Sequence, residues 1–385
     1  MSARPAVVFG LLHAGLALVR GLGRARVPVT GIAWRENEFG LSSRYVTERV
    51  LLGGNGLRNP GDALLDTLRR IADGGRVVLF PERDENVELV LDRWDEVREV
   101  ADVPLPGDPE VARRMRRKEI LVLEAEKAGV PAPRTVLASD EAAIRAAGLE
   151  PPFLVKPAEG QEFAATFGEK AVVARGLDDA VAVWRRAREH GFDMIVQELI
   201  PDATDRIYSL FTYVGRSGEP LGSVVGRKVR QSPIDFGSSA VFEVDYVPEV
   251  EEQGQRLLRS AGYTGFAHIE MAHDLRDGSF KLIEVNTRTP IWGGLVMTRA
   301  FDLAELAYRD LAGEEVEPLG TFKEDARWIF LAKDVWVSLQ LGRRRRLGVR
   351  EFAAPYVRGR KVRANFAADD LRGTVASLGY LRERF

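Results

Sequence analysis

Cysteine is absent from the 385 residues of this chain, and histidine occurs only four times. The lack of cysteine excludes disulfide scaffolds, thiolate catalysis and cysteine-based zinc or iron–sulfur sites. The scarcity of histidine argues against an imidazole-rich metal site, so a metal would have to be bound through oxygen ligands. This chemistry favours magnesium over zinc.

A large excess of charge is also missing, because 55 Lys and Arg stand against 57 Asp and Glu. Proteins whose main partner is nucleic acid usually carry a clear basic excess. No apolar run reaches the ~20 residues that a bilayer span needs. Residues 6–19 resemble a signal-peptide core, but Gly10, His13 and Gly15 interrupt them and no small-residue cleavage site follows. We therefore expect a cytoplasmic protein without a membrane or nucleic-acid partner.

The apolar content of 45% can bury a large core, and the length suggests two or three folding units. Residues 1–105 alternate short apolar strands with helices, which is typical of a parallel sheet in a small doubly wound domain. A helix is expected from Asp108 to about Lys127, because Asp108-Pro109-Glu110 has the residues of a helix start. Residues 195–286 are rich in predicted strands. Residues 321–385 carry 15 Lys and Arg against 7 Asp and Glu, so this end of the chain is basic.

The loop between the first strand and the first helix has Gly10 and Gly15 at the first spacing of a phosphate-binding loop. Leu16 and Ala17 follow, where such a loop would have Lys and Ser or Thr. Two interpretations stay open: a turn that lets the strand meet the helix, or a helix N-terminus that binds an anionic substrate group.

A lysine stands inside the apolar strand at residues 152–157, PFLVKP. A buried ammonium is costly without a partner, and a phosphate would be a natural partner for Lys156. The following loop, residues 159–168, has glycines and small residues that suit a flexible flap over a polyphosphate, although a plain hairpin loop is an equal alternative. Lys118 would be interpreted as a solvated lysine if it stood alone.

The segment at residues 195–201, IVQELIP, is a second candidate for nucleotide binding. An extended apolar linker can offer backbone N–H and C=O groups to an adenine edge, and Asp205 could accept hydrogen bonds from both ribose hydroxyls. Taken alone, the segment is a buried strand that ends in a turn.

Glu270 and Glu284 stand in two apolar strands that flank the turn signal Arg276-Asp277-Gly278. A three-residue hairpin loop centred on Asp277 would place Glu270 opposite Glu284, with Asn286 on the same face. Two opposed carboxylates repel each other unless a cation lies between them. Oxygen ligands at this spacing predict Mg²⁺ bridging phosphates, and two separately solvated acids are the alternative.

Lys228 and Arg230 alternate on one face of the strand that precedes this pair. Both could neutralise a transferring phosphoryl group or hold a carboxylate. An exposed basic strand is the alternative.

Taken in order, these features resemble the ATP-grasp superfamily. Residues 288–294, RTPIWGG, resemble the carboxylate–amine ligases related to D-aspartate ligase and to the halves of carbamoyl-phosphate synthetase. The flap departs from the family pattern at Glu159 and Glu162, where relatives often have glycines or serines. The resemblance implies an α/β plus α+β fold. Its expected parts are a Rossmann-like N-terminal domain (1–105), a first ATP-grasp subdomain with the flap (106–194), a second subdomain with the metal site (195–320) and a basic C-terminal extension (321–385).

The resemblance also implies an ATP-dependent ligase that activates a carboxylate as an acyl phosphate and joins it to an amine. ATP and Mg²⁺ would be the cofactors, a small-molecule carboxylate and amine the substrates, and a homodimer is left open. A biotin-type carboxylase, a phosphotransferase and a non-catalytic nucleotide sensor are the alternatives. The implied ATP-binding residues are Lys118, Lys156, Gln197, Glu198, Leu199, Ile200 and Asp205, the metal ligands Glu270, Glu284 and Asn286, and the catalytic residues Arg288, Lys228 and Arg230.

Overall fold

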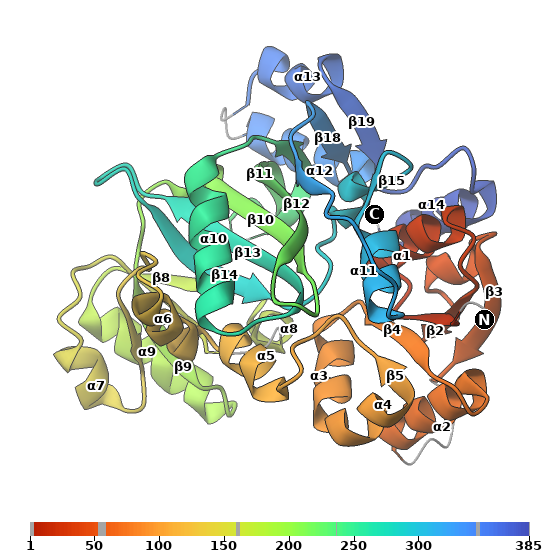
Figure 1. Cartoon of the computed structure of the whole chain (residues 1–385). Coiled ribbons are helices and arrows are strands. Elements are labelled where there is room, and N and C mark those ends of the chain that lie inside the picture. Colours follow the sequence, from red (N-terminus) through yellow and green to blue (C-terminus); the bar gives the residue numbers. More distant parts are fainter. Residues whose placement is uncertain (1–3, 53–58, 159–161, 236, 344–346, 385) are drawn as a thin grey trace.

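The computed structural model of the protein describes residues 4–52, 59–158, 162–235, 237–343 and 347–384 (Figure 1). Residues 159–161, the start of the predicted flap, lie outside the described residues. Within the described ranges, no helix is long and apolar enough to cross a membrane.

The first part of the chain forms a five-stranded parallel sheet in the order β3-β2-β1-β4-β5. Ala6 and Val8 pack in one apolar cluster with helix α1, while Val7 and Phe9 pack on the opposite face with α2 and α3. The predicted parallel sheet is therefore present, with helices on both faces (Figure 1). Its elements are β1 Ala6–Phe9, α1 His13–Arg24, β2 Val29–Ala33, η1 Phe39–Ser42, β3 Val46–Leu51, α2 Pro60–Ala72, β4 Val77–Pro81, α3 Asp84–Asp92, α4 Trp94–Val100 and β5 Ala101–Asp102.

The second part is built on a four-stranded antiparallel sheet in the order β6-β9-β7-β8. Helix α9 packs on this sheet through a separate apolar cluster. The elements here are α5 Pro109–Arg116, α6 Lys118–Lys127, β6 Thr135–Leu137, α7 Glu141–Ala146, β7 Phe153–Pro157, α8 Glu162–Phe167, β8 Val172–Ala174, α9 Leu177–Glu189 and β9 Met194–Glu198.

The single helix predicted from Asp108 to about Lys127 is wrong, because α5 ends at Arg116 and α6 begins at Lys118. The predicted start is confirmed, since the Asp108 side chain accepts a hydrogen bond from the Glu110 backbone N–H at 2.9 Å. Arg117 between the two helices has an extended backbone, and the Lys118 N–H donates to the carbonyl of Ala158. This long-range contact sets the break, and no local residue signals it.

The third part centres on an eight-stranded sheet. Its main path runs β14-β13-β10-β11-β12-β18-β19, and β17 pairs with β11. The elements are η2 Ala203–Asp205, β10 Ile207–Val214, β11 Pro220–Ser232, β12 Ser238–Val244, α10 Pro248–Ser260, β13 Gly265–His273, β14 Phe280–Asn286, η3 Gly293–Val296, β15 Met297–Thr298, β16 Phe301–Asp302, α11 Leu303–Leu311, β17 Gly320–Phe322, β18 Ala326–Ile329, α12 Leu331–Arg343, α13 Val349–Val357, β19 Arg360–Arg363 and α14 Leu371–Arg384.

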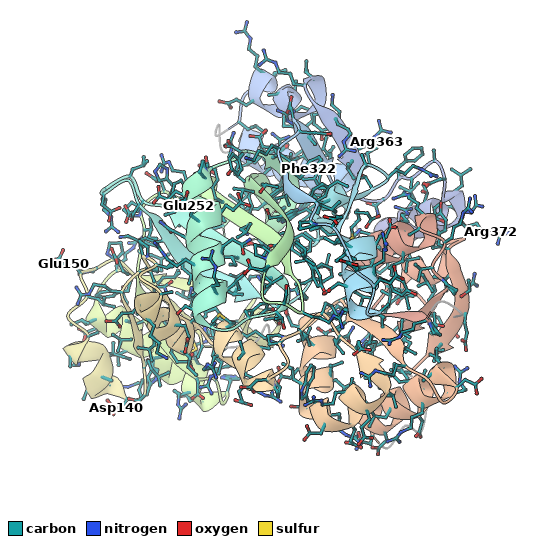
Figure 2. The ribbon with its side chains drawn as sticks, viewed as in Figure 1. Asp140, Glu150, Glu252, Phe322, Arg363 and Arg372 are labelled. Carbon is teal, nitrogen blue, oxygen red and sulfur yellow. The ribbon has the colours of Figure 1, made fainter. Side chains whose placement is uncertain are left out.

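The basic C-terminal segment, residues 321–385, shares this sheet. Strand β18 pairs antiparallel with β12, and β19 pairs with β18. Figure 2 shows side chains such as Arg363 and Arg372 on the outer surface of this segment.

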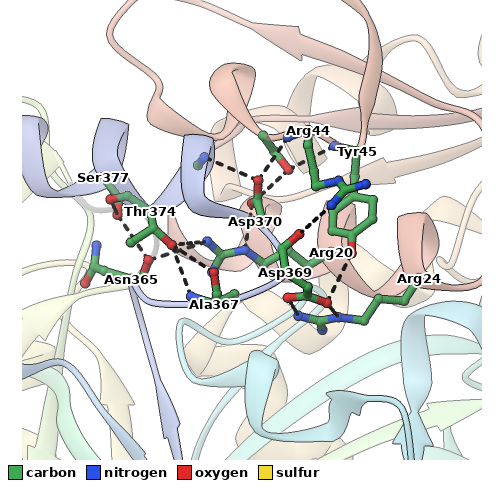
Figure 3. Close-up of polar contacts among 12 residues, drawn as sticks. Arg20, Arg24, Arg44, Tyr45, Asn365, Ala367, Asp369, Asp370, Thr374 and Ser377 are labelled. Atoms are coloured by element: carbon green, nitrogen blue, oxygen red, sulfur yellow. Dashed lines mark hydrogen bonds and ion pairs between the residues drawn. The ribbon is translucent and has the colours of Figure 1, made fainter.

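The last part of the segment returns to the first sheet. Asp370 is fully buried and accepts hydrogen bonds from the Arg20 guanidinium, the Ser43 hydroxyl and the Arg44 backbone, each at 2.9 Å (Figure 3). The neighbouring Asp369 binds the guanidinium of Arg24. The C-terminal segment is therefore joined both to the eight-stranded sheet and to helix α1.

Candidate active site

A cavity of about 770 Å³ is lined by strands of the four-stranded and eight-stranded sheets and by residues at the carboxyl ends of β1 and β4. Every residue predicted for the site lines this cavity except Arg230. Segments that are far apart in the sequence therefore meet in one place.

Lys156, on β7, is one of the cavity's buried cations, with 6% of its surface exposed. Burial lowers the pKa of its ammonium to about 7, and the nearby charge of Lys118 acts in the same direction. None of the described residues forms a hydrogen bond or ion pair with the Lys156 ammonium. Lys118, at the start of α6, donates to the Ala158 carbonyl at 3.4 Å. The two lysines give this end of the cavity the chemistry of an anion site.

The predicted adenine linker follows β9 along the cavity wall. The Gln197 side chain donates to the Thr135 hydroxyl at 2.7 Å, and the Glu198 carboxylate pairs with Arg276 at 2.5 Å. These side chains are therefore held by the protein. The backbone of residues 195–198 is paired with β6 and β7, and the Glu198 N–H donates to the Arg134 carbonyl at 2.8 Å. Leu199 and Ile200 continue the lining, and Asp205 lies exposed at the end of η2.

Glu270 on β13 lies directly opposite Glu284 on β14, as the sequence predicted. The predicted three-residue loop is wrong, however, because β13 ends at His273 and pairs there with Phe280. A bulge at Ile283 shifts the register by one residue and brings the two glutamates opposite each other. The left-handed turn residue is Gly278, with a φ of 74°.

The two glutamates differ in their neighbours. Glu270 accepts from the Lys228 ammonium at 2.7 Å, and Glu284 accepts from the Asn286 amide at 3.1 Å. Burial and the charge of Glu284 raise the pKa of Glu270, against the opposing effect of Lys228. Burial would also raise the pKa of Glu284, but the positive charges of Lys118 and Lys228 outweigh burial and lower it.

This donor set fits Mg²⁺, which prefers carboxylate and amide oxygens and leaves positions for phosphate oxygens and water. Within the described ranges, no group of three or more histidine and acidic side chains is placed to hold a metal ion. Two carboxylates and the Asn286 amide would therefore be the protein's share of the ligands.

His268 was not predicted as a site residue, although strand alternation places it on the same face as Glu270. Its ring is buried, and its Nδ1 lies 3.4 Å from the Asn286 amide nitrogen. Burial lowers the pKa of His268 to about 3, with the charge of Lys228 acting in the same direction. The imidazole is therefore neutral at physiological pH.

Arg288 follows β14 and reaches the first part of the chain. Its guanidinium makes two hydrogen bonds to the Asp84 carboxylate, at 2.7 and 2.8 Å. Burial alone would lower the pKa of Arg288, but the Asp84 charge raises it above its usual value. Asp84 was not predicted; the available signal was that it follows β4, at the edge of a parallel sheet where ligands commonly bind.

Arg230 does not enter the cavity, which corrects the sequence-based placement of Lys228 and Arg230 at one site. Its guanidinium binds Asp334 of α12 at 2.5 and 2.9 Å, and its side chain is 3% exposed. The register of β11 against β12 shifts on both sides of Arg230, so simple alternation fails there.

The loop from Gly10 to Gly15 fits the first of its two interpretations, a turn between strand and helix. Gly10 has a φ of 96°, and the Leu11 N–H donates to the Glu38 carboxylate at 2.6 Å. Glu82 packs against both glycines. Carboxylates of the protein therefore already lie where an anionic substrate group would have been expected.

No family model matches the chain. The chain is 26% identical over 239 residues to a D-aspartate ligase from Enterococcus faecium (strain Aus0004), covering 59% of this chain and 56% of that protein. It therefore spans about half the length of the curated relative that it matches.

Solved structures resemble the chain more extensively. Biotin carboxylase from Campylobacter jejuni in complex with a nucleotide has a TM-score of 0.63 and 17% identity, covering 81% of this chain and 71% of that chain. N5-carboxyaminoimidazole ribonucleotide synthetase with ADP has a TM-score of 0.64 and 15% identity, covering 89% and 87%. L-amino acid ligase from Bacillus licheniformis has a TM-score of 0.60 and 15% identity, covering 80% and 74%. The chain therefore has the ATP-grasp fold and resembles the carboxylate–amine ligases of that superfamily, as predicted from the sequence.

Proposed function

We propose that this protein is an ATP-dependent carbon–nitrogen ligase, which activates a substrate carboxylate as an acyl phosphate and joins it to an amine. The observation that carries the proposal is the cavity, which combines two lysines, an opposed pair of glutamates and an arginine. The likeness to D-aspartate ligase and L-amino acid ligase supports an amino acid as one of the substrates.

The chemistry requires activation because oxide is too poor a leaving group for an amine to displace from a carboxylate. Attack of the carboxylate on the γ-phosphoryl group of ATP would form the acyl phosphate and ADP. The amine, after its ammonium form has lost a proton to solvent, would then attack the acyl carbon and break the bond to the phosphate oxygen, releasing inorganic phosphate and a second proton. Positioning and charge neutralisation supply most of the catalysis in such reactions, so no nucleophilic side chain is needed.

In this proposal ATP lies between the four-stranded sheet and β14. Lys118 and Lys156 hold the α- and β-phosphates, residues 197–200 contact the adenine, and Asp205 binds the ribose. Glu270, Glu284 and Asn286 hold one or two Mg²⁺ ions, which supply charge neutralisation on the phosphates.

Lys228 and Arg288 serve the reacting groups. Lys228 contacts Glu270, so it is near enough to neutralise a phosphoryl group bound at the same carboxylates. Arg288 binds the substrate carboxylate or the acyl phosphate, and Asp84 fixes the orientation of its guanidinium through the two hydrogen bonds. Asp84 is thus a positioning residue in this scheme.

The organisation into 1–105, 106–194, 195–320 and 321–385, with a Rossmann-like first domain, is part of the proposal. It is supported by the separate sheets of the first three parts. The last part pairs with the third part's sheet, so we treat residues 321–385 as a supporting element of the second ATP-grasp subdomain.

A hydroxylamine trapping assay tests this function. Purified protein is incubated with ATP, Mg²⁺ and single amino acids, and hydroxylamine converts an acyl phosphate into a stable hydroxamate. We expect hydroxamate and ADP with at least one acid, and loss of both products in Lys156→Ala. Lys127→Ala, at the exposed end of α6, is the control and should behave as the wild type. Absence of hydroxamate with every acid would contradict the proposal.

Carboxylation is the second candidate, because biotin carboxylase and N5-carboxyaminoimidazole ribonucleotide synthetase are structural neighbours. Bicarbonate replaces the amino acid in the same assay, with ADP release as the readout. ADP release that depends on bicarbonate and on no amino acid would favour this candidate over the ligase.

A further inference from the structure

The first part of the chain closes one end of the cavity with a run of charged residues that follows β4. Three arginines at this end each have an acidic partner. Arg288 binds Asp84, Arg83 pairs with Glu85 at 2.5 Å, and Arg116 pairs with Glu88 at 3.3 Å. Acidic side chains of the protein therefore offset part of the positive charge at this end of the cavity.

Glu82, at the same end of the cavity, differs from these paired residues because one of its carboxylate oxygens has no partner within the described part of the chain. Its side chain lines the cavity, the residue is 7% exposed, and none of the described residues forms an ion pair with it. Its Oε2 has no hydrogen-bond partner within the described part of the chain. A buried carboxylate oxygen without a partner is uncommon in folded proteins and points to a missing ligand.

The backbone around Glu82 shows which charge the missing ligand carries. The N–H of Leu11 is bound by Glu38, and the N–H of Gly15 donates to Glu82 itself. Burial raises the pKa of Glu82 to about 7, since the opposing influences of Arg288 and Arg83 do not offset the lost hydration. A negatively charged ligand here would be repelled by the Glu82 carboxylate. It would also find that the N–H groups of Leu11 and Gly15 already donate to Glu38 and Glu82. A positively charged group with N–H donors would restore the missing partner.

We propose that Glu82 forms the subsite for the amine substrate, and that its free oxygen accepts a hydrogen bond from a primary ammonium group. The proposal rests on the ligase function above and adds the class of the second substrate, which is a cationic primary amine. The two substrates then approach from different directions. The acid lies beside Lys228 and Arg288, and the amine enters from the first part of the chain.

Glu82→Gln tests the subsite. The amide keeps an acceptor for the Gly15 N–H but loses the negative charge, so the loop between β1 and α1 stays intact. Two small amines of similar size serve as probes with the acid found by trapping. Methylamine is protonated at neutral pH, whereas hydroxylamine is uncharged there.

We expect Glu82→Gln to lower kcat/KM for methylammonium by about tenfold or more, because one charge-assisted hydrogen bond is lost. The rate with hydroxylamine should stay within about twofold of the wild type, since acyl phosphate formation and a neutral amine do not use this charge. Glu85→Gln is the matched control. Glu85 is close in sequence to Glu82 but pairs with Arg83, so this variant should behave as the wild type with both probes.

The possible failures are distinguishable. An unchanged kcat/KM for methylammonium in Glu82→Gln would contradict the amine subsite and leave the ligase function standing. An equal loss with both amines would also contradict it, because a purely structural role for Glu82 affects both probes alike. Absence of hydroxamate in the wild type would contradict the ligase function and, with it, the subsite.

Discussion

Glu270 and Glu284 face each other across two paired strands, and Glu270 is buried while Glu284 is half-buried. Opposed carboxylates in this position repel each other, and Lys228 contacts only one of the pair. The Glu270 charge costs free energy in the folded protein, because burial and the charge of Glu284 raise its pKa, and the pair provides a site for a divalent ion. Such a local conflict with stability is typical of functional residues.

Glu284→Gln tests the role of this pair in binding the metal ion. The substitution removes one of the two charges and keeps the shape of the side chain. We expect ATP turnover to fall to background, while the free energy of unfolding without Mg²⁺ also falls, because Lys118 and Lys228 lower the pKa of Glu284 and so stabilise its charge in the folded protein. Turnover assays and urea denaturation measure the two effects. Glu252→Gln, on the exposed face of α10, is the control. Near-wild-type turnover would remove Glu284 from the metal site.

The buried Lys156 predicts how the stability of the folded protein depends on pH. Its pKa is lowered to about 7 in the folded protein, below the ordinary lysine value of 10.5. Between these two values the unfolded chain holds a proton that the folded chain has lost. The folded state of the free enzyme therefore gains stability relative to the unfolded state as pH rises from about 7 to about 10, with a slope of up to about 1.4 kcal/mol per pH unit.

Lys156→Met should lack this contribution, so its free energy of unfolding relative to the wild type should fall as pH rises through the same window. Below about pH 7 the folded and unfolded states of the wild type both carry the charge, and the difference should be constant. Chemical denaturation of both proteins across the window measures the slope. A pH-independent difference would contradict the burial of this ammonium.

At the scale of elements, a buried ion pair joins β11 to α12, and this pair lies outside the candidate active site. Arg230 and Asp334 make two hydrogen bonds, and the Tyr356 hydroxyl donates to the same carboxylate at 2.5 Å. Removing one partner of a buried pair leaves an uncompensated charge in the protein interior. Arg230 therefore has a structural role that its position in the strand alone does not reveal.

Arg230→Ala should lower the free energy of unfolding by about 3–5 kcal/mol, because Asp334 loses its counter-ion. The paired change Arg230→Met with Asp334→Leu should be less destabilising, since neither charge is left alone. The folded fraction should keep a wild-type KM for ATP. Denaturation curves and steady-state kinetics test this together. If Arg230→Ala has wild-type stability but no ATP turnover, Arg230 belongs to the active site and this account of its structural role is contradicted.

The parts of the site that are local in sequence could be predicted, and the parts that depend on distant segments could not. Strand alternation and the Asp277-Gly278 turn predicted the pairing of Glu270 with Glu284, but the predicted loop was wrong, and the bulge at Ile283, which was not foreseen, restores that pairing. The partner of Arg230 lies 104 residues away, and the helix break at Arg117 depends on the carbonyl of Ala158. Such contacts form only when the sheets pack, so no local pattern signals them.

At the scale of the whole molecule, the C-terminal segment links the two ends of the fold. Strand β18 extends the eight-stranded sheet, and Asp370 then returns to the helix that starts beside the cavity. Residues 12–14, at the entry to α1, line the cavity. We infer that the basic segment stabilises the end of the site that the first part of the chain provides.

Asp370→Ala should be destabilising by about 3–5 kcal/mol, because the buried Arg20 loses its partner and the Arg44 N–H loses an acceptor. Asp369→Ala is the matched comparison. Its carboxylate is 30% exposed, so solvent can replace part of the lost interaction with Arg24 and the effect should be smaller. Thermal denaturation of both variants measures the order. A reversed order would contradict this account of the C-terminal anchor.

The central claim is that the cavity between the sheets binds ATP together with Mg²⁺. Calorimetric titration with a non-hydrolysable ATP analogue, with and without Mg²⁺, tests it most directly and needs no knowledge of the other substrates. We predict Mg²⁺-dependent binding to the wild type and its loss in Lys156→Ala, with Lys127→Ala unchanged. Binding that is indifferent to Mg²⁺ and to Lys156, or no binding to the wild type, would contradict the claim.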